Sequence, residues 1–341
     1  MKALVLEEAG RLVMKDCPKP VACKGEVLVR TMAATICTSD INDINYNPFG
    51  IELPMIMGHE GAGIIEAVGE GVTDFFIGDE IAAHPVMPCG KCVSCKRGLA
   101  HLCDDMAHLG INHGGVFAEY FTIRADRIRR KPKNISFAAA TLMEPVCVCI
   151  EAVKRANINA GSNTLIIGDG PFGVMIANIC RAMYPGNKTI ISGRHDFRLN
   201  YAGNNNETEK INAKNYKSAK EITEEILKRS GGEGIDSAII CVGTADALDT
   251  AVEVCRSRGT VCVFSAIHEK APVDMFRVHV KELNICGSCN DMDYLDAAVN
   301  ILATGEIANV ITHELPFDDY ERAFKLISDK RSETLKVSLI F

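Results

Sequence analysis

The sequence lacks any uninterrupted run of eighteen apolar residues, which excludes a predicted membrane-spanning helix. It also lacks a dense run of lysine and arginine, and its 37 basic residues are outnumbered by 44 acidic ones, for a net charge of −7. Proteins that bind nucleic-acid backbones normally carry the opposite sign, so nucleic acid is not an expected partner. Glu7 and Glu8 precede any possible signal-peptide core, so we expect a cytoplasmic protein.

The remaining composition is that of an ordinary globular protein. The chain has 341 residues, of which 47% are hydrophobic and 24% charged, and this length predicts two domains. Fifteen cysteines without a secretion signal argue against a disulfide framework and favour zinc ligands or reduced thiols. Four cysteines are clustered, and the other eleven are scattered through apolar segments, where free cysteine behaves as a small buried hydrophobe.

The character of the chain changes near residue 150. The first part is rich in turns and predicts short β-strands, among them 27–31 and the glycine-rich 61–69. The second part alternates continuous apolar runs with helical patterns, which indicates an α/β fold with a parallel sheet covered on both faces. We predict strands at 163–167, 188–192, 235–242, 259–264 and 283–287, and helices at 174–184, 219–229 and 245–255.

The C-terminal part predicts two further helices, at 293–303 and 320–327, and a final paired strand at 336–341. The sequence contains no internal repeat or low-complexity tract. The run of asparagines at 204–206 is predicted to be a loop.

The strongest local motif is a cluster of four cysteines with the spacing Cys89-x-x-Cys92-x-x-Cys95-x7-Cys103. Four thiolates suit tetrahedral zinc, and such tight spacing closes a site against solvent, so the motif predicts a structural zinc lobe. Four unrelated buried thiols and an iron–sulfur cluster are the alternatives. The evidence for an iron–sulfur cluster is weaker, because the fourth cysteine is not followed by the proline typical of such clusters.

The second motif is the glycine loop Gly168-Asp169-Gly170-Pro171-Phe172-Gly173, which follows a predicted strand and opens a predicted helix. In this context Gly168 permits the tight turn, Gly170 lets a pyrophosphate approach, and Gly173 allows close packing of helix and strand. The helix N-terminus then offers amide donors to the phosphates. We therefore assign the whole loop, including Pro171 and Phe172, to a nicotinamide dinucleotide.

In such a fold, the residues that follow the second strand discriminate between NADP and NAD. This strand ends Ser192-Gly193-Arg194-His195, without the acidic residue that binds the ribose 2′-hydroxyl of NAD. A guanidinium can pair with a 2′-phosphate, so Arg194 favours NADP(H) over NAD(H). Asp196 is the alternative acid, if the turn is longer.

Three dispersed elements complete the candidates: Cys37, the pair His59-Glu60, and Glu144-Pro145. No spacing rule links them, and each alone also has a non-functional interpretation. The cysteine could be a core residue, the histidine a hydrogen-bonded polar residue, and the Glu-Pro pair a turn. Taken with the cysteine lobe, the cofactor loop and the segments 58–63, 114–120 and 315–319, they resemble the zinc-dependent medium-chain dehydrogenase/reductase family. This family includes alcohol, polyol and threonine dehydrogenases.

The resemblance implies a GroES-like, mostly β catalytic domain, residues 1–149 and 288–341, with a Rossmann domain, residues 150–287, inserted in it and an active site in the cleft between them. It implies that Cys37, His59 and Glu144 bind a catalytic zinc, with Glu60 as a fourth or exchangeable ligand. Three such ligands leave a position open on zinc, as catalysis requires. The substrate alcohol is expected to bind as a zinc alkoxide that passes hydride to the cofactor, with Ser39 relaying its proton.

The same resemblance bears on substrate and assembly. Glu144 and its neighbours are similar to the polyol branch, whereas 37–40 and 192–194 are similar to NADP-dependent secondary alcohol dehydrogenases. We therefore expect a secondary alcohol or polyol, or the matching ketone, as substrate. A threonine or sugar-phosphate dehydrogenase and a non-catalytic nucleotide-binding protein are the alternatives. A homodimer or homotetramer is expected.

Two positions depart from the pattern of the family. The usual proton-relay histidine is replaced by Asn42, which cannot titrate, so another route for the proton is expected, through cofactor ribose hydroxyls and water or a rerouted relay. The usual substrate-binding arginine is replaced by Asn290, which weakens a plain sorbitol assignment. Tyr46 and Phe117 are candidates for the substrate pocket, with ordinary packing as the alternative. His108 and His113 flank a glycine-rich loop and are interpreted mainly as turn residues.

Overall fold

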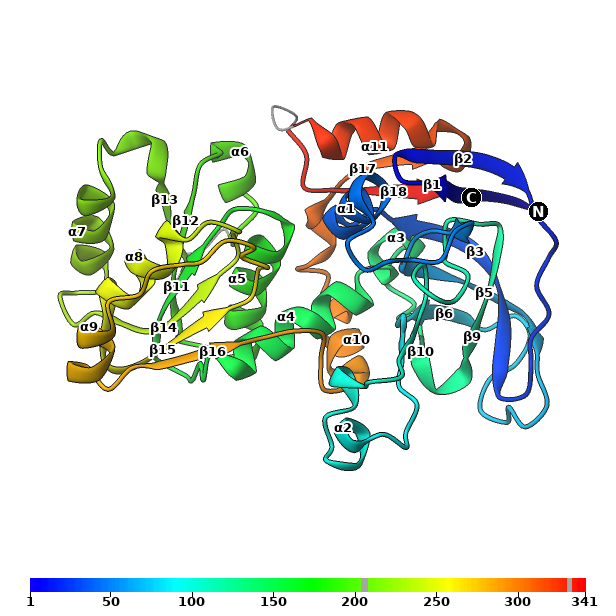
Figure 1. The fold of residues 1–341 in the computed structure, drawn as a ribbon, viewed down its shortest axis with the longest axis horizontal. Coiled ribbons are helices and arrows are strands. Elements are labelled where there is room, and N and C mark those ends of the chain that lie inside the picture. Colours follow the sequence, from blue (N-terminus) through cyan, green and yellow to red (C-terminus); the bar gives the residue numbers. More distant parts are fainter. Residues whose placement is uncertain (204–207, 330–332) are drawn as a thin grey trace. The chain divides into compact units, whose positions relative to one another are not determined.

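The computed structural model describes residues 1–203, 208–329 and 333–341, and the loop predicted at 204–206 lies outside these ranges. The described chain forms two compact units, one of residues 1–147 with 292–341 and the other of residues 148–291 (Figure 1). The divisions predicted from the sequence lie after residues 149 and 287. Within the described ranges, no helix is both long and apolar enough to cross a bilayer.

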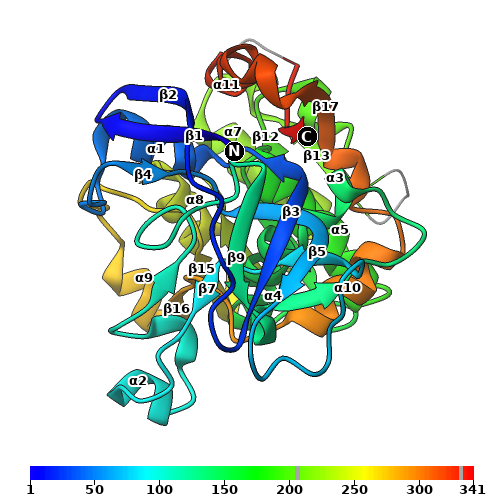
Figure 2. The same cartoon turned by 90° about the vertical axis from the view of Figure 1, so that its right-hand side faces the viewer.

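The first unit is built on a seven-stranded, mostly antiparallel sheet of order β10-β6-β5-β3-β18-β17, with β9 also paired to β3 (Figure 2). Its strands are β3 Glu26–Thr35, β5 Glu60–Val68, β6 Glu80–Ala83, β9 Tyr120–Arg124, β10 Ile128–Arg130, β17 Ile311–Pro316 and β18 Lys336–Ile340. Alternate side chains of β3 and β9, such as Val27, Val29 and Phe121, enter one hydrophobic core. The predicted final strand therefore pairs with the centre of this sheet.

Smaller elements surround this sheet. Two further sheets are formed by β1 Lys2–Glu8, β2 Arg11–Asp16 and β4 Met55–Ile56, and by β7 Val86–Met87 and β8 Ala107–His108. The helices of this unit are α1 Thr38–Tyr46, α2 Val93–Lys96, α3 Phe137–Ala140, α10 Leu295–Ala303 and α11 Tyr320–Ser328. The lobe that carries α2 projects from the rest of the unit (Figures 1 and 2).

The second unit is a six-stranded parallel sheet of order β13-β12-β11-β14-β15-β16. The strands are β11 Asn163–Ile167, β12 Lys188–Gly193, β13 Thr208–Asn212, β14 Ile235–Ile240, β15 Cys255–Val263 and β16 Asn284–Gly287. The helices are α5 Pro171–Met183, α6 Asp196–Leu199, α7 Ala219–Arg229, α8 Asp246–Val254 and α9 Met275–Val280, while α4 Met143–Arg155 runs across the division. Helix α5 packs against β11 and β12, and α8 against β14 and β15, so the predicted parallel sheet with covering helices is confirmed.

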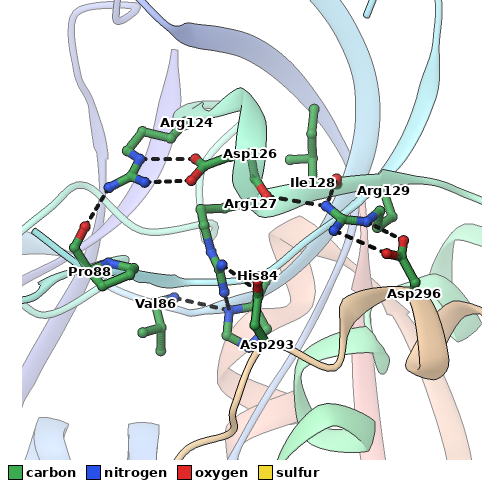
Figure 3. Close-up of polar contacts among 10 residues, drawn as sticks. All are labelled: His84, Val86, Pro88, Arg124, Asp126, Arg127, Ile128, Arg129, Asp293 and Asp296. Carbon is green, nitrogen blue, oxygen red and sulfur yellow. Dashed lines mark hydrogen bonds and ion pairs between the residues drawn. The ribbon is translucent and has the colours of Figure 1, made fainter. Parts of the chain in front are cut away.

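A buried arginine binds the segment that re-enters the first unit after residue 291 (Figure 3). Arg127, just before β10, forms a 2.6 Å ion pair with Asp293 and donates to His84 Nδ1 at 2.9 Å. Arg129 pairs with Asp296 in the first turn of α10 at 2.5 Å. Since a buried guanidinium is costly to leave unpaired, these contacts hold the segment that follows residue 291 against β10.

Candidate functional site

Three potential metal ligands meet where β3 ends and β5 begins. Antiparallel pairing puts Thr35 opposite Glu60, so Cys37, two residues after β3, lies beside His59 and Glu60. The ligand atoms of Cys37, His59 and Glu60 lie within 4.8 Å of one another, and all three residues are buried. Sulfur, nitrogen and oxygen donors gathered in one buried group suit zinc.

The backbone before His59 has a shape that only glycine adopts easily. Gly58 has a φ of +92°, and a Cβ on it would lie 2.6 Å from the ring of Phe117. Phe117 itself is fully buried in the core and packs edge-on against Phe324, so its ring is a fixed surface against which Gly58 packs. Gly58 thereby fixes the approach of His59 to Cys37.

One buried carboxylate orients two members of the group. Asp40, in the first turn of α1, accepts the Cys37 main-chain N–H on Oδ2 at 2.8 Å and contacts His59 Nδ1 through Oδ1 at 3.0 Å. Burial by itself lowers the pKa of His59, but the charges and hydrogen bonds of Asp40 and Cys37 together outweigh it and raise that pKa well above the ordinary value. A carboxylate on Nδ1 leaves Nε2 as the ligand atom, which is the usual support for a metal-bound histidine.

Glu60 is also held by a cation, Lys336 of β18. The Nζ atom of Lys336 lies 2.5 Å from Oε1 and 2.6 Å from Oε2 of Glu60, and both residues are almost completely buried. Burial lowers the pKa of Lys336, but the charges of Glu60, Cys37 and Glu144 reverse this and raise it above 10.5. Glu60 is therefore an ion-paired carboxylate at the edge of the metal-binding group.

The four clustered cysteines form a second group of potential metal ligands. The Sγ atoms of Cys89, Cys92, Cys95 and Cys103 all lie within 4.8 Å of one another in the lobe around α2. Main-chain N–H groups point at three of these sulfurs; for example, Cys92 N–H donates to Cys89 Sγ and Cys95 N–H to Cys92 Sγ, both at 3.4 Å. Such donors stabilise thiolates, and four thiolates at these separations fit a closed tetrahedral zinc site.

The glycine loop lies between β11 and α5, as the motif required. A Cβ on Gly173 would fall 2.0 Å from the Gly168 carbonyl oxygen, whereas one on Gly170 would meet nothing within 4 Å. Gly170 is the N-cap of the thirteen-residue α5, and Pro171 occupies its first turn. Gly173 thus lets the helix start close to the strand, and the space at Gly170 suits a pyrophosphate at the helix N-terminus.

The turn after β12 is organised by Asp169 of the same loop. Asp169 Oδ2 accepts the main-chain N–H groups of Arg194 and His195, both at 2.6 Å, and contacts His195 Nδ1 at 3.1 Å. A Cβ on Gly193 would lie 2.3 Å from that of Asp169, so glycine is needed for this approach. Ser192 is buried and Arg194 is exposed.

Comparisons with known proteins agree with this arrangement. Residues 23–133 match the alcohol dehydrogenase GroES-like domain, and residues 171–304 match the zinc-binding dehydrogenase domain. D-xylulose reductase A of Aspergillus oryzae is 31% identical over 94% of this chain and 92% of its own length. The chain belongs to the zinc-dependent medium-chain dehydrogenase family. L-threonine 3-dehydrogenase of Pyrococcus furiosus is 32% identical, with the same two shares covered.

Solved structures extend this likeness to the whole fold of the dehydrogenase. A zinc-binding dehydrogenase from Sinorhizobium meliloti bound to NADP superposes with a TM-score of 0.92 and 26% identity, covering 100% of this chain and 99% of its own. An alcohol dehydrogenase from Escherichia coli in complex with NADH has a TM-score of 0.90, 26% identity and the same coverage. The predicted family and fold are confirmed, and the protein is an oxidoreductase of the zinc-dependent alcohol and polyol dehydrogenase group.

The dehydrogenase differs in one respect from the ligand set that the resemblance implied. Glu60, expected as a fourth or exchangeable ligand, lies in the compact group, while Glu144 does not belong to that group among the described residues. Glu144 lies buried in the first turn of α4, close enough to Lys336 to raise its pKa. Ser39 lies half-buried in the first turn of α1, and Asn42 is exposed on the same helix.

Three functional neighbours were missed by sequence reasoning. The sequence assigns no role to Asp40, which lies in the segment 37–40, and predicts Lys336 only as part of the final strand at 336–341. The ring of His108 lies 5.8 Å from that of His59 between centroids, although His108 was interpreted mainly as a turn residue. Burial lowers the pKa of His108 to about 3, so its imidazole is neutral beside the metal-binding group. Asp40 could have been found from its position three residues after Cys37, where its carboxylate caps the start of α1. Lys336 and His108 are far from Cys37 and His59 in the sequence, so no spacing rule links them to this group.

Proposed function

We propose that the protein transfers hydride between NADP(H) and a secondary alcohol or polyol, with the ketone as the oxidised form. The observation that carries this proposal is the buried group of Cys37, His59 and Glu60 with Asp40 behind it. Such a set suits a catalytic metal rather than a structural one, because it mixes ligand types and is not closed by four thiolates. The cysteine lobe would hold a second, structural zinc.

In the proposed catalytic set, Cys37, His59 and Glu144 are the resident ligands and Glu60 is the exchangeable one. The Lys336 contacts to both carboxylate oxygens support this distinction, because they compete with a metal for the same lone pairs. When bound there, zinc supplies Lewis acidity toward a substrate oxygen. The half-buried Ser39 hydroxyl, two residues after Cys37, would accept the substrate proton and pass it to solvent.

A panel of alcohols tests this proposal. The purified protein, with its zinc content measured, is assayed with NADP on polyols, small secondary alcohols and L-threonine, and with NADPH on the matching ketones. We expect turnover on a polyol or secondary alcohol to exceed that on L-threonine by at least about tenfold in kcat/KM. Faster turnover of L-threonine would replace the proposal by the second candidate, which the threonine dehydrogenase relative supports. Full zinc loading with no turnover would favour a non-catalytic protein.

Arg194 is proposed to select NADP. Asp169 fixes the turn through main-chain donors, so the exposed guanidinium of Arg194 is left to meet a 2′-phosphate. Replacing it in the variant Arg194→Ala should weaken NADPH binding by about 10–100-fold, the worth of one or two charge-assisted hydrogen bonds. The affinity for NADH should change by less than about threefold, since NADH has no 2′-phosphate.

Fluorescence titration with both reduced cofactors measures this effect. Lys188→Ala is the matched control, because Lys188 is an exposed cation at the opposite end of the same strand β12. Tighter binding of NADH than NADPH by the unmodified protein would contradict the proposal. In that case Asp196, which now accepts the Asn212 amide at 2.6 Å, would become the residue to test.

A further inference from the structure

Two cysteines face each other at the edge of the parallel sheet of the second unit, whereas both proposed metal sites belong to the first unit. Strand β15 pairs with the edge strand β16, and the register places Cys262 directly opposite Cys286. Opposed residues of neighbouring strands point to the same face. Neighbouring strands lie about 4.8 Å apart, within the Cα separation of about 4.4–6.8 Å that a disulfide spans.

The two thiols differ in exposure and in acidity. Cys262 is completely buried, whereas Cys286 is partly accessible, and its Sγ atom lies 3.2 Å from the Arg155 carbonyl oxygen. A hydrogen bond from the Cys262 thiol lowers the pKa of Cys286 to about 7 against the effect of burial, and the charge of Arg155 assists. A reachable, acidic thiol beside a buried one is the arrangement of an attacking and a resolving cysteine.

The sequence offers a rival partner, since Cys286-Gly287-Ser288-Cys289 has Cys-x-x-Cys spacing. The structure argues against that pairing. Ser288 N–H donates to the Val263 carbonyl at 3.1 Å, so the chain stays extended beyond the end of β16. Residues three apart in an extended segment are about 10 Å apart and point to opposite faces, which is too far for a disulfide.

We propose that Cys262 and Cys286 form a reversible redox pair, in which a peroxide oxidises the two thiols to a disulfide that links β15 to β16. The Cys286 thiolate attacks one peroxide oxygen, the O–O bond breaks, and a sulfenic acid and hydroxide result. The Cys262 sulfur then displaces the sulfenic oxygen as water and loses its own proton. In sum, two thiols and one hydrogen peroxide give one disulfide and two waters.

Peptide mapping of the intact, zinc-loaded protein tests this proposal. The reduced protein is treated with hydrogen peroxide at about a tenfold molar excess, alkylated and digested, and its cross-linked peptides are identified by mass spectrometry. We expect a disulfide between Cys262 and Cys286 that dithiothreitol reverses. Its formation should be at least about tenfold faster than oxidation of the exposed Cys23, because the thiolate is the reactive form.

Variants separate the two possible partners of Cys286. The Cys289→Ser protein should form the same disulfide at the same rate, whereas Cys262→Ala should leave Cys286 as a sulfenic acid that dimedone traps. The unmodified protein already gives a decisive answer, so poor folding of a variant does not obscure it. A Cys286–Cys289 disulfide, or a Cys286 that stays alkylatable under peroxide, would overturn the proposal.

Discussion

Replacing His59 with glutamine should lower kcat/KM by about 10³-fold or more. The imidazole is one of three buried donors whose ligand atoms lie within 4.8 Å of one another, and Asp40 aims it at the others. A Lewis-acid metal contributes several kcal/mol to stabilising the transition state, and each 1.36 kcal/mol is about tenfold in rate. The amide of glutamine binds zinc poorly and cannot use the Asp40 contact in the same way.

Steady-state kinetics and zinc analysis of the same sample measure this effect. The variant should retain the zinc of the cysteine lobe and lose most of the other, so its zinc content should fall by about half. His113→Gln is the matched control, since His113 is half-buried and its side chain contacts the main-chain and side-chain oxygens of Thr122. Nearly full activity with full zinc in His59→Gln would exclude a catalytic metal that His59 holds together with Cys37.

Much of the fold could be predicted because its signals are local. Helix α7 has the predicted bounds, since its charged and apolar residues follow a helical period between a serine cap and a glycine pair. The four cysteines of the lobe are close in sequence, so their spacing alone implied their meeting. By contrast, strand β13 was not predicted, because Thr208–Asn212 is polar and lies at the sheet edge, where one side needs no partner.

The surroundings of Cys37, His59 and Glu60 could not be predicted in the same way. Cys37, His59 and Lys336 come from three strands or their ends, and only the register of β3 with β5 and β18 joins them. A lysine inside an apolar strand gives no local sign that its amine is paired. Resemblance to the family supplied the candidate ligands, but the ion pair between Lys336 and Glu60 could be found only from the structure.

Lys336→Met should lower the free energy of unfolding by about 3–5 kcal/mol, the cost of leaving a buried charge without its partner. Glu60 is fully buried, and both of its carboxylate oxygens contact Lys336 Nζ. Removal of the amine therefore leaves a charged carboxylate in the core without its partner. Methionine keeps the length and apolar character of the side chain, which limits the loss of packing. Urea unfolding of the zinc-loaded protein measures the difference.

Two comparisons show whether the loss comes from the buried pair. Lys2→Met removes an exposed ion pair, since Lys2 Nζ lies 2.8 Å from Asp318, and should cost less than about 1 kcal/mol. In the double variant Lys336→Met with Glu60→Gln, the charge of the buried Glu60 carboxylate is also removed, so most of the lost stability should return. A loss of less than about 1 kcal/mol in Lys336→Met would mean that a bound metal, rather than the lysine, neutralises Glu60. Glu60 would then be a resident ligand instead of an exchangeable one.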